Sequence, residues 1–436
     1  MYHKQLKIII VVLLIISLFS VILSGCNQNK ANILNPAGSS GNVTDSGAKN
    51  PVILDFYIWD DEESYITPVV DAYNALNTAV QVQLHVLSSA TYDKEIKADL
   101  NSNIKIDLLG IHGISSMVQI KDMGKLLDLT SYIATNDMDV TAYGSMFNDI
   151  AVDGKYYGIP TRSTCWFLLY NKDLFDDVGI SYPGQMTWEE YRQLAKKLTR
   201  GEGDSKVYGG YWVPWCSNFE ALQQSSYLID DDLTLTRETL ELLNDCYNVD
   251  ESHVSFKIAS DENTNYLEEF EKGYIAMMPQ GEWIINMLLN DEAKGISDIN
   301  WDIAPMPIVE GLDPGTTWGQ YQFVSIAQKT AYPEEAFDFV QFLCGKEGAR
   351  IYAQNSIIHA YSDDEIKQLY LETVGKPSAS ILFEAKRVQE QLAVSGYEEI
   401  NDVFKDDIAK KYLNGEITLD EAMADFEKKR DQILNP

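Results

Sequence analysis

Basic residues are scarce in this chain of 436 residues. It contains 34 Lys and Arg against 66 Asp and Glu, which gives a formal net charge of −32 at pH 7. Lys and Arg supply most of the affinity for phosphate backbones, so nucleic acids and anionic lipid surfaces repel a chain this acidic. We therefore expect no nucleic-acid partner, and a ligand that is neutral, cationic or small.

Catalytic motifs are missing as well. The sequence has no G-x-S-x-G, H-E-x-x-H, G-x-x-x-x-G-K-S/T or G-x-G-x-x-G, so the common hydrolase, metalloprotease and nucleotide-binding motifs are absent. It also has only five His, which is few for an enzyme that uses acid-base catalysis. No C-x-x-C occurs, and no His stands at ligand spacing from a Cys. We expect no metal, no other cofactor and no enzymatic activity. A surface glycosidase stays open as an alternative, because its paired carboxylates are defined by their separation in space.

Cysteine is rare beyond the first residues. One of the five lies at position 26, and the other four have irregular spacings. An extracytoplasmic compartment would permit a disulfide, but a core of this size does not need one. We expect free, buried thiols at Cys165, Cys216, Cys246 and Cys344.

The N-terminus has the pattern of a secretory signal. Lys4 and Lys7 precede an almost purely aliphatic run at 8–22, which predicts a signal peptide over residues 1–25. A membrane span is the alternative, because the uncharged stretch at 8–25 just reaches spanning length. Leu-Ser-Gly-Cys at 23–26 resembles a bacterial lipobox. The resemblance implies that Cys26 is lipidated and anchors the protein on the extracytoplasmic face of the cell membrane.

Residues 26–50 are rich in Asn, Gly and Ser without an apolar period, which predicts a flexible tether. The folded part therefore starts near residue 51. The chain is 45% hydrophobic and 23% charged, as in globular proteins, and its length exceeds what one core usually supports. We expect two lobes.

Strand and helix patterns alternate at the start of the folded part. Apolar, β-rich runs at 52–59, 80–86 and 104–111 are separated by helical patterns at 65–78 and 91–101, and a third helical pattern follows at 115–123. This order predicts a β-α-β-α-β lobe with a parallel sheet. Ligands bind beyond the carboxyl ends of such strands, which points to the segments after Trp59 and after Ile111.

A second unit begins with a strand-like run at 165–170. Thr187 with Glu190, and Thr418 with Glu421, have the spacing of a capping box, so a helix is expected to begin at each Thr. Strands are predicted at 274–278 and 323–327. After them the pattern is helical at 334–343, 347–355, 378–392, 397–413 and 418–433.

Five segments taken together resemble a known family. They are DGKYYGIP at 153–160, LLYNKDLFDDVGI at 168–180, TWEEYRQLAKKL at 187–198, FEKGYIAMMPQGEW at 270–283 and YPEEAFDFVQFLCGKEGARIY at 332–352. In this order they are similar to the family 1 extracellular solute-binding proteins, the lipid-anchored, maltose-binding-type receptors of bacterial carbohydrate importers. The similarity spans essentially the whole chain after Cys26.

The resemblance implies an α/β fold of the two-lobed, type II periplasmic-binding-protein kind. Its discontinuous lobes are joined by a multi-strand hinge, which the chain would cross near 160–165, near 318–323 and again after Leu343. Lobe 1 would comprise residues 51–162 and 323–346, and lobe 2 residues 163–322 and 347–436. A sugar would lie in the cleft between the lobes.

Sugar sites combine flat aromatic side chains, which cover the C–H face of a ring, with polar side chains aimed at its hydroxyls. The expected loops carry this mixture. The resemblance places Trp215 in an aromatic platform and Trp283 in a Gly-x-Trp turn that stacks on sugar. The candidate ligand-binding residues are Trp59, Asp60, His112, Arg162, Trp215, Gln280, Glu282, Trp283, Trp318 and Tyr321.

We therefore expect a membrane-tethered, monomeric protein that captures a mono- or oligosaccharide and delivers it to the permease subunits of an ABC importer. The alternatives are a binding protein for a peptide, a polyamine or an amino-sugar, for which the acidic loops would be useful, and the surface glycosidase.

Overall fold

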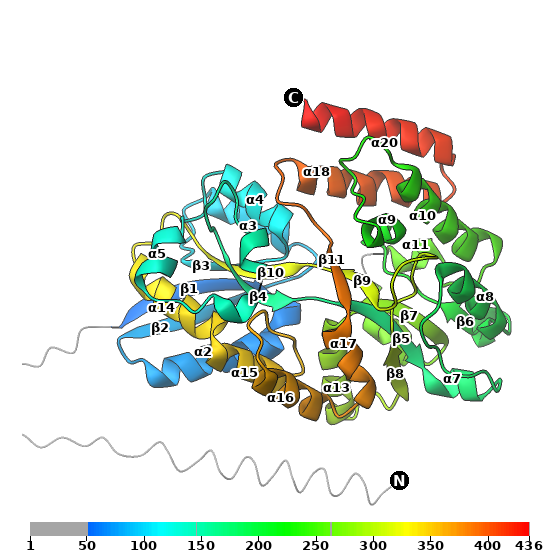
Figure 1. The fold of residues 1–436 in the computed structure, drawn as a ribbon, viewed down its shortest axis with the longest axis horizontal. Helices are drawn as coiled ribbons and strands as arrows, with labels where there is room; N and C mark the ends of the chain where they lie inside the picture. Colours follow the sequence, from blue (N-terminus) through cyan, green and yellow to red (C-terminus); the bar gives the residue numbers. More distant parts are fainter. Residues whose placement is uncertain (1–50, 145, 262–263, 436) are drawn as a thin grey trace, which may run out of the picture. The chain divides into compact units, whose positions relative to one another are not determined.

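The computed structural model describes residues 51–144, 146–261 and 264–435. The predicted signal peptide, Cys26 and the tether lie outside these residues. Figure 1 shows helices packed around two larger sheets, with a two-stranded sheet between them, and this is the predicted α/β class. Within the described part of the chain, every helix is too short or too polar to cross a lipid bilayer.

The first sheet has five strands in the order β2-β1-β3-β10-β4. Strands β1 (Val52–Trp59), β2 (Val80–Leu87) and β3 (Leu108–Ile111) are parallel, which confirms the predicted β-α-β-α-β arrangement. Strand β10 (Tyr321–Ile326) runs antiparallel to β3, and β4 (Ile159–Ser163) runs antiparallel to β10. The sheet is therefore mixed.

Helices cover this sheet with apolar stripes. In α2, for example, Tyr65, Ile66, Val69 and Tyr73 are buried at helical spacing. The helices of this part are η1 (Asp60–Glu62), α2 (Glu63–Leu76), α3 (Tyr92–Leu100), α4 (Ile114–Asp122), α5 (Thr130–Thr135), η2 (Thr141–Tyr143), α6 (Met146–Asp149), α14 (Pro333–Cys344) and α15 (Lys346–Gln354).

The second sheet has the order β6-β7-β5-β8. Its strands are β5 (Trp166–Asn171), β6 (Tyr208–Gly210), β7 (Ile275–Gly281) and β8 (Trp301–Ala304). Every residue of β5 and β7 is buried, which explains their continuous apolar sequence.

Both predicted capping boxes are present: Thr187 begins α8 (Trp188–Leu198), and Thr418 begins α20 (Leu419–Leu434). The remaining helices are α7 (Lys172–Asp176), η3 (Gly203–Ser205), α9 (Phe219–Gln223), α10 (Thr234–Asn244), η4 (Asp245–Val249), α11 (Phe256–Ala259), α12 (Tyr266–Glu271), α13 (Trp283–Lys294), α16 (Asp364–Val374), η5 (Pro377–Ser380), α17 (Ile381–Glu384), α18 (Tyr397–Asp402), η6 (Val403–Ala409) and α19 (Lys410–Leu413).

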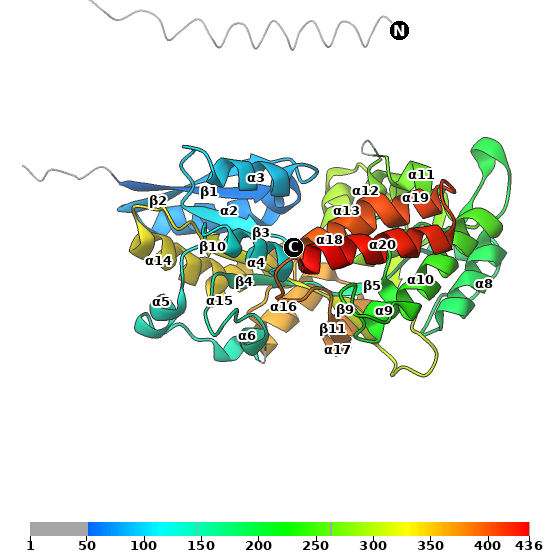
Figure 2. The same ribbon diagram turned by 90° about the horizontal axis from the view of Figure 1, so that it is seen from above.

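Three chain segments meet between the two larger sheets. Thr164, between β4 and β5, donates its backbone N–H to the Gln320 carbonyl at 2.9 Å. Strand β9 (Thr316–Gly319) pairs in parallel with β11 (Lys386–Gln389), and the Glu390 N–H continues this ladder to the Gly319 carbonyl at 2.9 Å. Figures 1 and 2 both place β9 and β11 in this position.

The predicted helix at 378–392 is wrong. The chain forms only the short helices η5 and α17 there, and strand β11 follows. Strand β9 offers a free edge to β11, and Arg387 donates to the backbone carbonyls of Ser163 (3.1 Å) and Thr164 (3.3 Å). These partners are distant in sequence, and they outweigh the local preference for helix.

The buried side chains form one cluster on each larger sheet and a smaller third cluster that joins α10 to α18, η6 and α20. The lobe boundaries stay a prediction, because α15 contributes to both clusters: Tyr352 belongs to the first, whereas Ala349 and Ala353 belong to the second. Cys165, Cys216, Cys246 and Cys344 are buried and free, as predicted.

Candidate functional site

A buried ion pair links the two larger sheets. Arg162 lies in β4 and Glu282 directly after β7, and their Nη2 and Oε1 atoms are 2.5 Å apart with side chains 3% and 0% exposed. Arg162 Nη1 also donates to the Tyr65 hydroxyl (2.9 Å) and to Gln322 Oε1 (3.1 Å). The structure brings Arg162 and Glu282 together as partners of each other, so ligand contact by either stays a prediction.

Glu62 is a second carboxyl in this network. Its Oε1 accepts a hydrogen bond from the Tyr65 hydroxyl at 2.8 Å. Burial raises the pKa of Glu62 to about 7, although the nearby charge of Arg162 acts in the opposite direction, and burial also raises the pKa of Glu282. Two carboxyls therefore lie near one guanidinium, Glu282 in direct contact and Glu62 through the Tyr65 hydroxyl, and a proton on Glu62 avoids a second buried negative charge.

Trp59 and His112 meet at the carboxyl ends of β1 and β3. Their rings stack with centroids 3.7 Å apart and 27° between the planes. His112 Nδ1 is 2.9 Å from Asp93 Oδ1; burial alone would lower the pKa of His112, but Asp93 raises it above its usual value. Asp60 is exposed, and its Oδ1 accepts from the Ser89 N–H at 2.9 Å. The rule that ligand sites lie beyond parallel strands thus led to two side chains that are neighbours in space.

We call the part of the protein that packs on the first sheet the first half, and the part that packs on the second sheet the second half. In the second half, the side chains of Trp215, Tyr266 and Trp283 form an aromatic group. Trp283 is half-buried in the first turn of α13, and its Nε1 donates to the Tyr266 hydroxyl at 3.1 Å. Trp215 is 39% exposed, and its ring centroid is 5.5 Å from that of Tyr266. Burial and, after it, the charge of Asp61 raise the pKa of Tyr266. Asp61 follows β1, so a carboxyl from the first half lies near the aromatic group.

Three predicted ligand residues lie elsewhere. Trp318 is 0% exposed and stacks on Trp166 with centroids 5.4 Å apart. Gln280 is also fully buried, and its side chain accepts from the neighbouring backbone. Neither leaves surface for a ligand in this structure, and the same holds for Trp59, Arg162 and Glu282, so ligand contact by these residues stays a prediction. Tyr321 is half-buried at the start of β10, and its contact with a ligand stays a prediction.

The segment after β11 connects both halves. Glu390 Oε2 accepts from Trp166 Nε1 at 3.2 Å in the second half. The next residue, Gln391, accepts through Oε1 from the Ser115 hydroxyl of α4 at 2.7 Å. The Ser115 hydroxyl also contacts the carboxyl of Glu398 in α18. The segment after β11 therefore contacts the first half through Gln391, while Glu390 lies next to the aromatic group.

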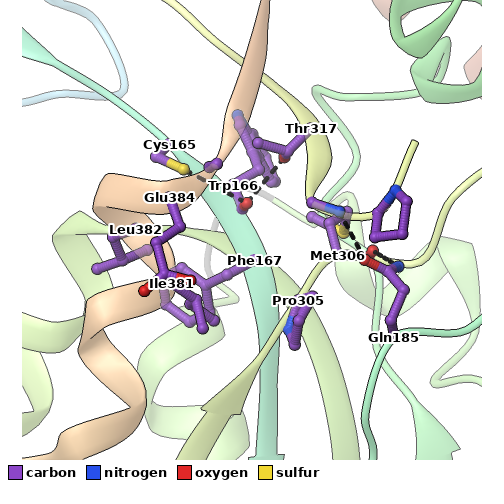
Figure 3. A pocket seen from close by; sticks show the side chains of 13 residues that line it. Cys165, Trp166, Phe167, Gln185, Pro305, Met306, Thr317, Ile381, Leu382 and Glu384 are labelled. Atoms are coloured by element: carbon purple, nitrogen blue, oxygen red, sulfur yellow. Dashed lines mark hydrogen bonds between the residues drawn. The ribbon is translucent and has the colours of Figure 1, made fainter. Parts of the chain in front are cut away.

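Two pockets border this region. A small one of about 30 Å³ lies between the loop that carries Trp215 and the segment that carries Glu390. A larger one of about 230 Å³ is lined mainly by apolar side chains, and Figure 3 shows Phe167 of β5, Leu382 of α17 and Met306 around it. Gln185 in its wall is already bonded to the Met306 carbonyl and the Gly315 N–H. The larger pocket has little to offer the hydroxyls of a sugar.

Sequence reasoning missed several residues of this region. Tyr266 could have been found, because Asn265 is a good N-cap and places Tyr266 in the first turn of α12. Asn218 follows closely after Trp215 in the same loop. Glu390 and Gln391 could not be found, because the sequence pattern placed them in a helix at 378–392, whereas they follow strand β11.

Aromatic faces and hydrogen-bond acceptors, rather than a nucleophile paired with a base, dominate this arrangement. Trp215 and Trp283 offer ring faces, and Asp61 and Glu390 offer carboxyls beside them. Such a set suits a ring that carries hydroxyls. Among the described residues, no group of three or more His, Cys, Asp or Glu could hold a metal ion.

Comparisons with known proteins agree with this geometry. A family model described as bacterial extracellular solute-binding protein matches residues 59–350. The melibiose/raffinose/stachyose-binding protein of Bacillus subtilis (strain 168) is 21% identical over 357 residues, 78% of this chain and 78% of that protein. A sugar transporter from Rhizobium etli, in an open conformation, superposes with a TM-score of 0.72 at 26% identity and covers 87% of this chain and 99% of its own. An ABC substrate-binding protein from Listeria monocytogenes in complex with cycloalternan has a TM-score of 0.76 at 22% identity and covers 88% and 99%.

Proposed function

Because this chain belongs to the family of bacterial extracellular solute-binding proteins, we propose that it binds a carbohydrate between its two larger sheets and delivers it to the permease subunits of an ABC importer. The observation that carries this proposal is the aromatic group of Trp215, Tyr266 and Trp283 beside the carboxyl of Asp61. The rings would cover the C–H faces of a sugar, and the carboxyl would accept from its hydroxyls.

Binding would draw the two halves together. His112, stacked on the buried Trp59, and Asp61 belong to the first half and the aromatic group to the second, so a ligand gains all its contacts only when both halves surround it. The three crossing segments would act as the hinge. The protein would release the sugar unchanged.

The relatives support a sugar as the ligand. The Rhizobium etli sugar transporter is 26% identical and covers 87% of this chain. The Bacillus subtilis relative is named for the sugars melibiose, raffinose and stachyose. Neutral mono- and oligosaccharides are therefore the first ligands to test.

The location is proposed from the sequence before residue 51. Cleavage ahead of Cys26 and acylation of that residue would hold a monomer on the extracytoplasmic face of the cell membrane, with residues 26–50 as the tether.

A ligand screen by thermal shift tests the function. The panel contains neutral mono- and oligosaccharides, amino-sugars, peptides and polyamines, and chromatography then examines whether the best ligand stays intact. We expect a neutral sugar to raise the melting temperature saturably and to be recovered unchanged. Cleavage of the sugar would identify a glycosidase instead, and a larger shift with a peptide, polyamine or amino-sugar would identify a different solute.

A further inference from the structure

The 30 Å³ pocket beside the aromatic group has a mixed lining, in which polar side chains accompany apolar ones such as Leu222, Leu228 and Phe404. Trp215 and Asn218 come from one loop, Glu390 and Gln391 from the segment after β11, and Asn401 and Lys405 from the C-terminal helices. A pocket this small suits a substituent of a ring, such as a hydroxyl or hydroxymethyl group, better than a whole ring.

Asn218 is the unusual member of this lining. Its side chain is 6% exposed, and neither its amide oxygen nor its amide nitrogen has a hydrogen-bond partner among the described residues. Buried polar groups are nearly always paired, because an unpaired one keeps the full cost of losing its water. An amide left open in this way can bind a partner from outside the chain, either a water molecule or a polar group of a ligand.

The charges in the lining restrict that partner. Glu390 accepts from Trp166 Nε1, and no ion pair joins its carboxyl to a cation within the described part of the chain. Lys405 also lines the pocket, but its ammonium is already paired with Asp402 at 3.2 Å and Asp406 at 3.7 Å. An anionic group would face the Glu390 carboxyl, and the Lys405 ammonium in the lining is already paired with other carboxylates.

We propose that this pocket takes an uncharged, hydroxyl-bearing substituent of the bound sugar, and that Asn218 and Glu390 determine specificity there. The inference rests on the proposed function and deepens it: the protein selects neutral sugars over uronates and sugar phosphates. The Asn218 amide offers two donors and an acceptor oxygen, and the Glu390 carboxyl accepts, which matches hydroxyls that donate and accept. Trp215 beside them covers the face of the ring.

Isothermal titration of the full chain tests the proposal with four probes: raffinose, maltotriose, mannobiose and the acidic trimer trigalacturonate. The parent is compared with Asn218→Ala and Glu390→Gln, and with Glu384→Gln as a matched control, since Glu384 is exposed in α17 and lies outside this pocket. A neutral probe that binds the parent should bind both pocket variants about tenfold more weakly. The control should match the parent, and trigalacturonate should bind the parent at least about tenfold more weakly than the best neutral probe.

Thermal melting separates binding from folding. Asn218→Ala removes an unpaired buried amide, so the ligand-free variant should melt no lower than the parent. Equal affinity of a neutral probe for the parent and both variants would overturn this inference and leave the proposed function standing. Tightest binding of trigalacturonate would also overturn the inference. If none of the four probes bound the parent, the proposed function would fail, and the inference with it.

Discussion

Burial raises the pKa of Glu390 to about 7, from a usual value of 4.5. Between these two pH values the folded protein holds a proton that the unfolded chain has released. The free energy of unfolding therefore falls as the pH rises through this window, and the loss is complete above about pH 7. Glu62 and Glu220 have pKa values raised to about 7 by burial as well, so they act in the same direction.

Replacing Glu390 with Gln should remove the loss of unfolding free energy at high pH, because Gln does not ionise. The hydrogen bond is kept, since the amide oxygen can still accept from Trp166 Nε1. We expect a free energy of unfolding higher than the parent's by roughly 1 to 3 kcal/mol at pH 8 and equal to it at pH 4.5. Calorimetry at the two pH values measures this. Glu384→Gln serves as the control and should change neither value, since Glu384 is exposed. The same difference at both pH values would contradict the account of a buried carboxyl.

A comparison of Trp283 with Trp318 distinguishes a proposed ligand contact from a core residue. Trp283→Ala should weaken binding of the best sugar about thirtyfold, as expected for an aromatic anchor, with a small change in the melting temperature because its ring is half-buried. Trp318→Ala removes a fully buried ring and should lower the free energy of unfolding by about 3 to 5 kcal/mol. Titration and melting of both variants decide this. A Trp283→Ala protein that melts as low as Trp318→Ala and binds sugar normally would make Trp283 a core residue.

Among the elements, the crossing segments tolerate little change. A Cβ on Gly319 would lie 2.1 Å from the backbone oxygen of Thr164, and a backbone oxygen cannot swing away as a side chain can. Any larger residue at 319 must therefore push the first two crossings apart.

Gly319→Ala should lower the free energy of unfolding by about 1 to 3 kcal/mol and weaken sugar binding, because the same contact positions both halves. Chemical denaturation and titration measure the two effects. Gly184→Ala is the matched control: its Cβ would have no atom within 4 Å, so it should behave like the parent. Identical results for the two variants would show that the crossings do not depend on this close approach.

Elements with local signals could be predicted from the sequence. The capping boxes at Thr187 and Thr418 and the alternating strands and helices at 52–123 all form as expected. Strand β11 could not be predicted, because its partner β9 lies about 70 residues earlier and its own sequence favours helix. The site shows the same division. Trp59 ends β1 and His112 follows β3, so both were expected, whereas the position of Glu390 depends on the unpredicted pairing of β11 with β9.

At the scale of the whole molecule, the proposed anchor keeps a strongly acidic protein at the cell surface. Cys26→Ser should abolish acylation, so that the protein is released or held only by its uncleaved hydrophobic segment. Metabolic labelling with a fatty-acid analogue and fractionation of cells and medium measure both consequences. Unchanged labelling of the Ser variant would refute the lipobox.

The central claim is that a sugar binds between the two larger sheets, in contact with both halves. A crystal structure of the protein with the best sugar from the screen tests it most directly. We expect the sugar ring against Trp283 or Trp215 of the second half, within hydrogen-bonding distance of Asp61 or His112 of the first. A sugar bound instead in the 230 Å³ pocket beside Phe167 and Leu382, or on one half alone, would contradict the account.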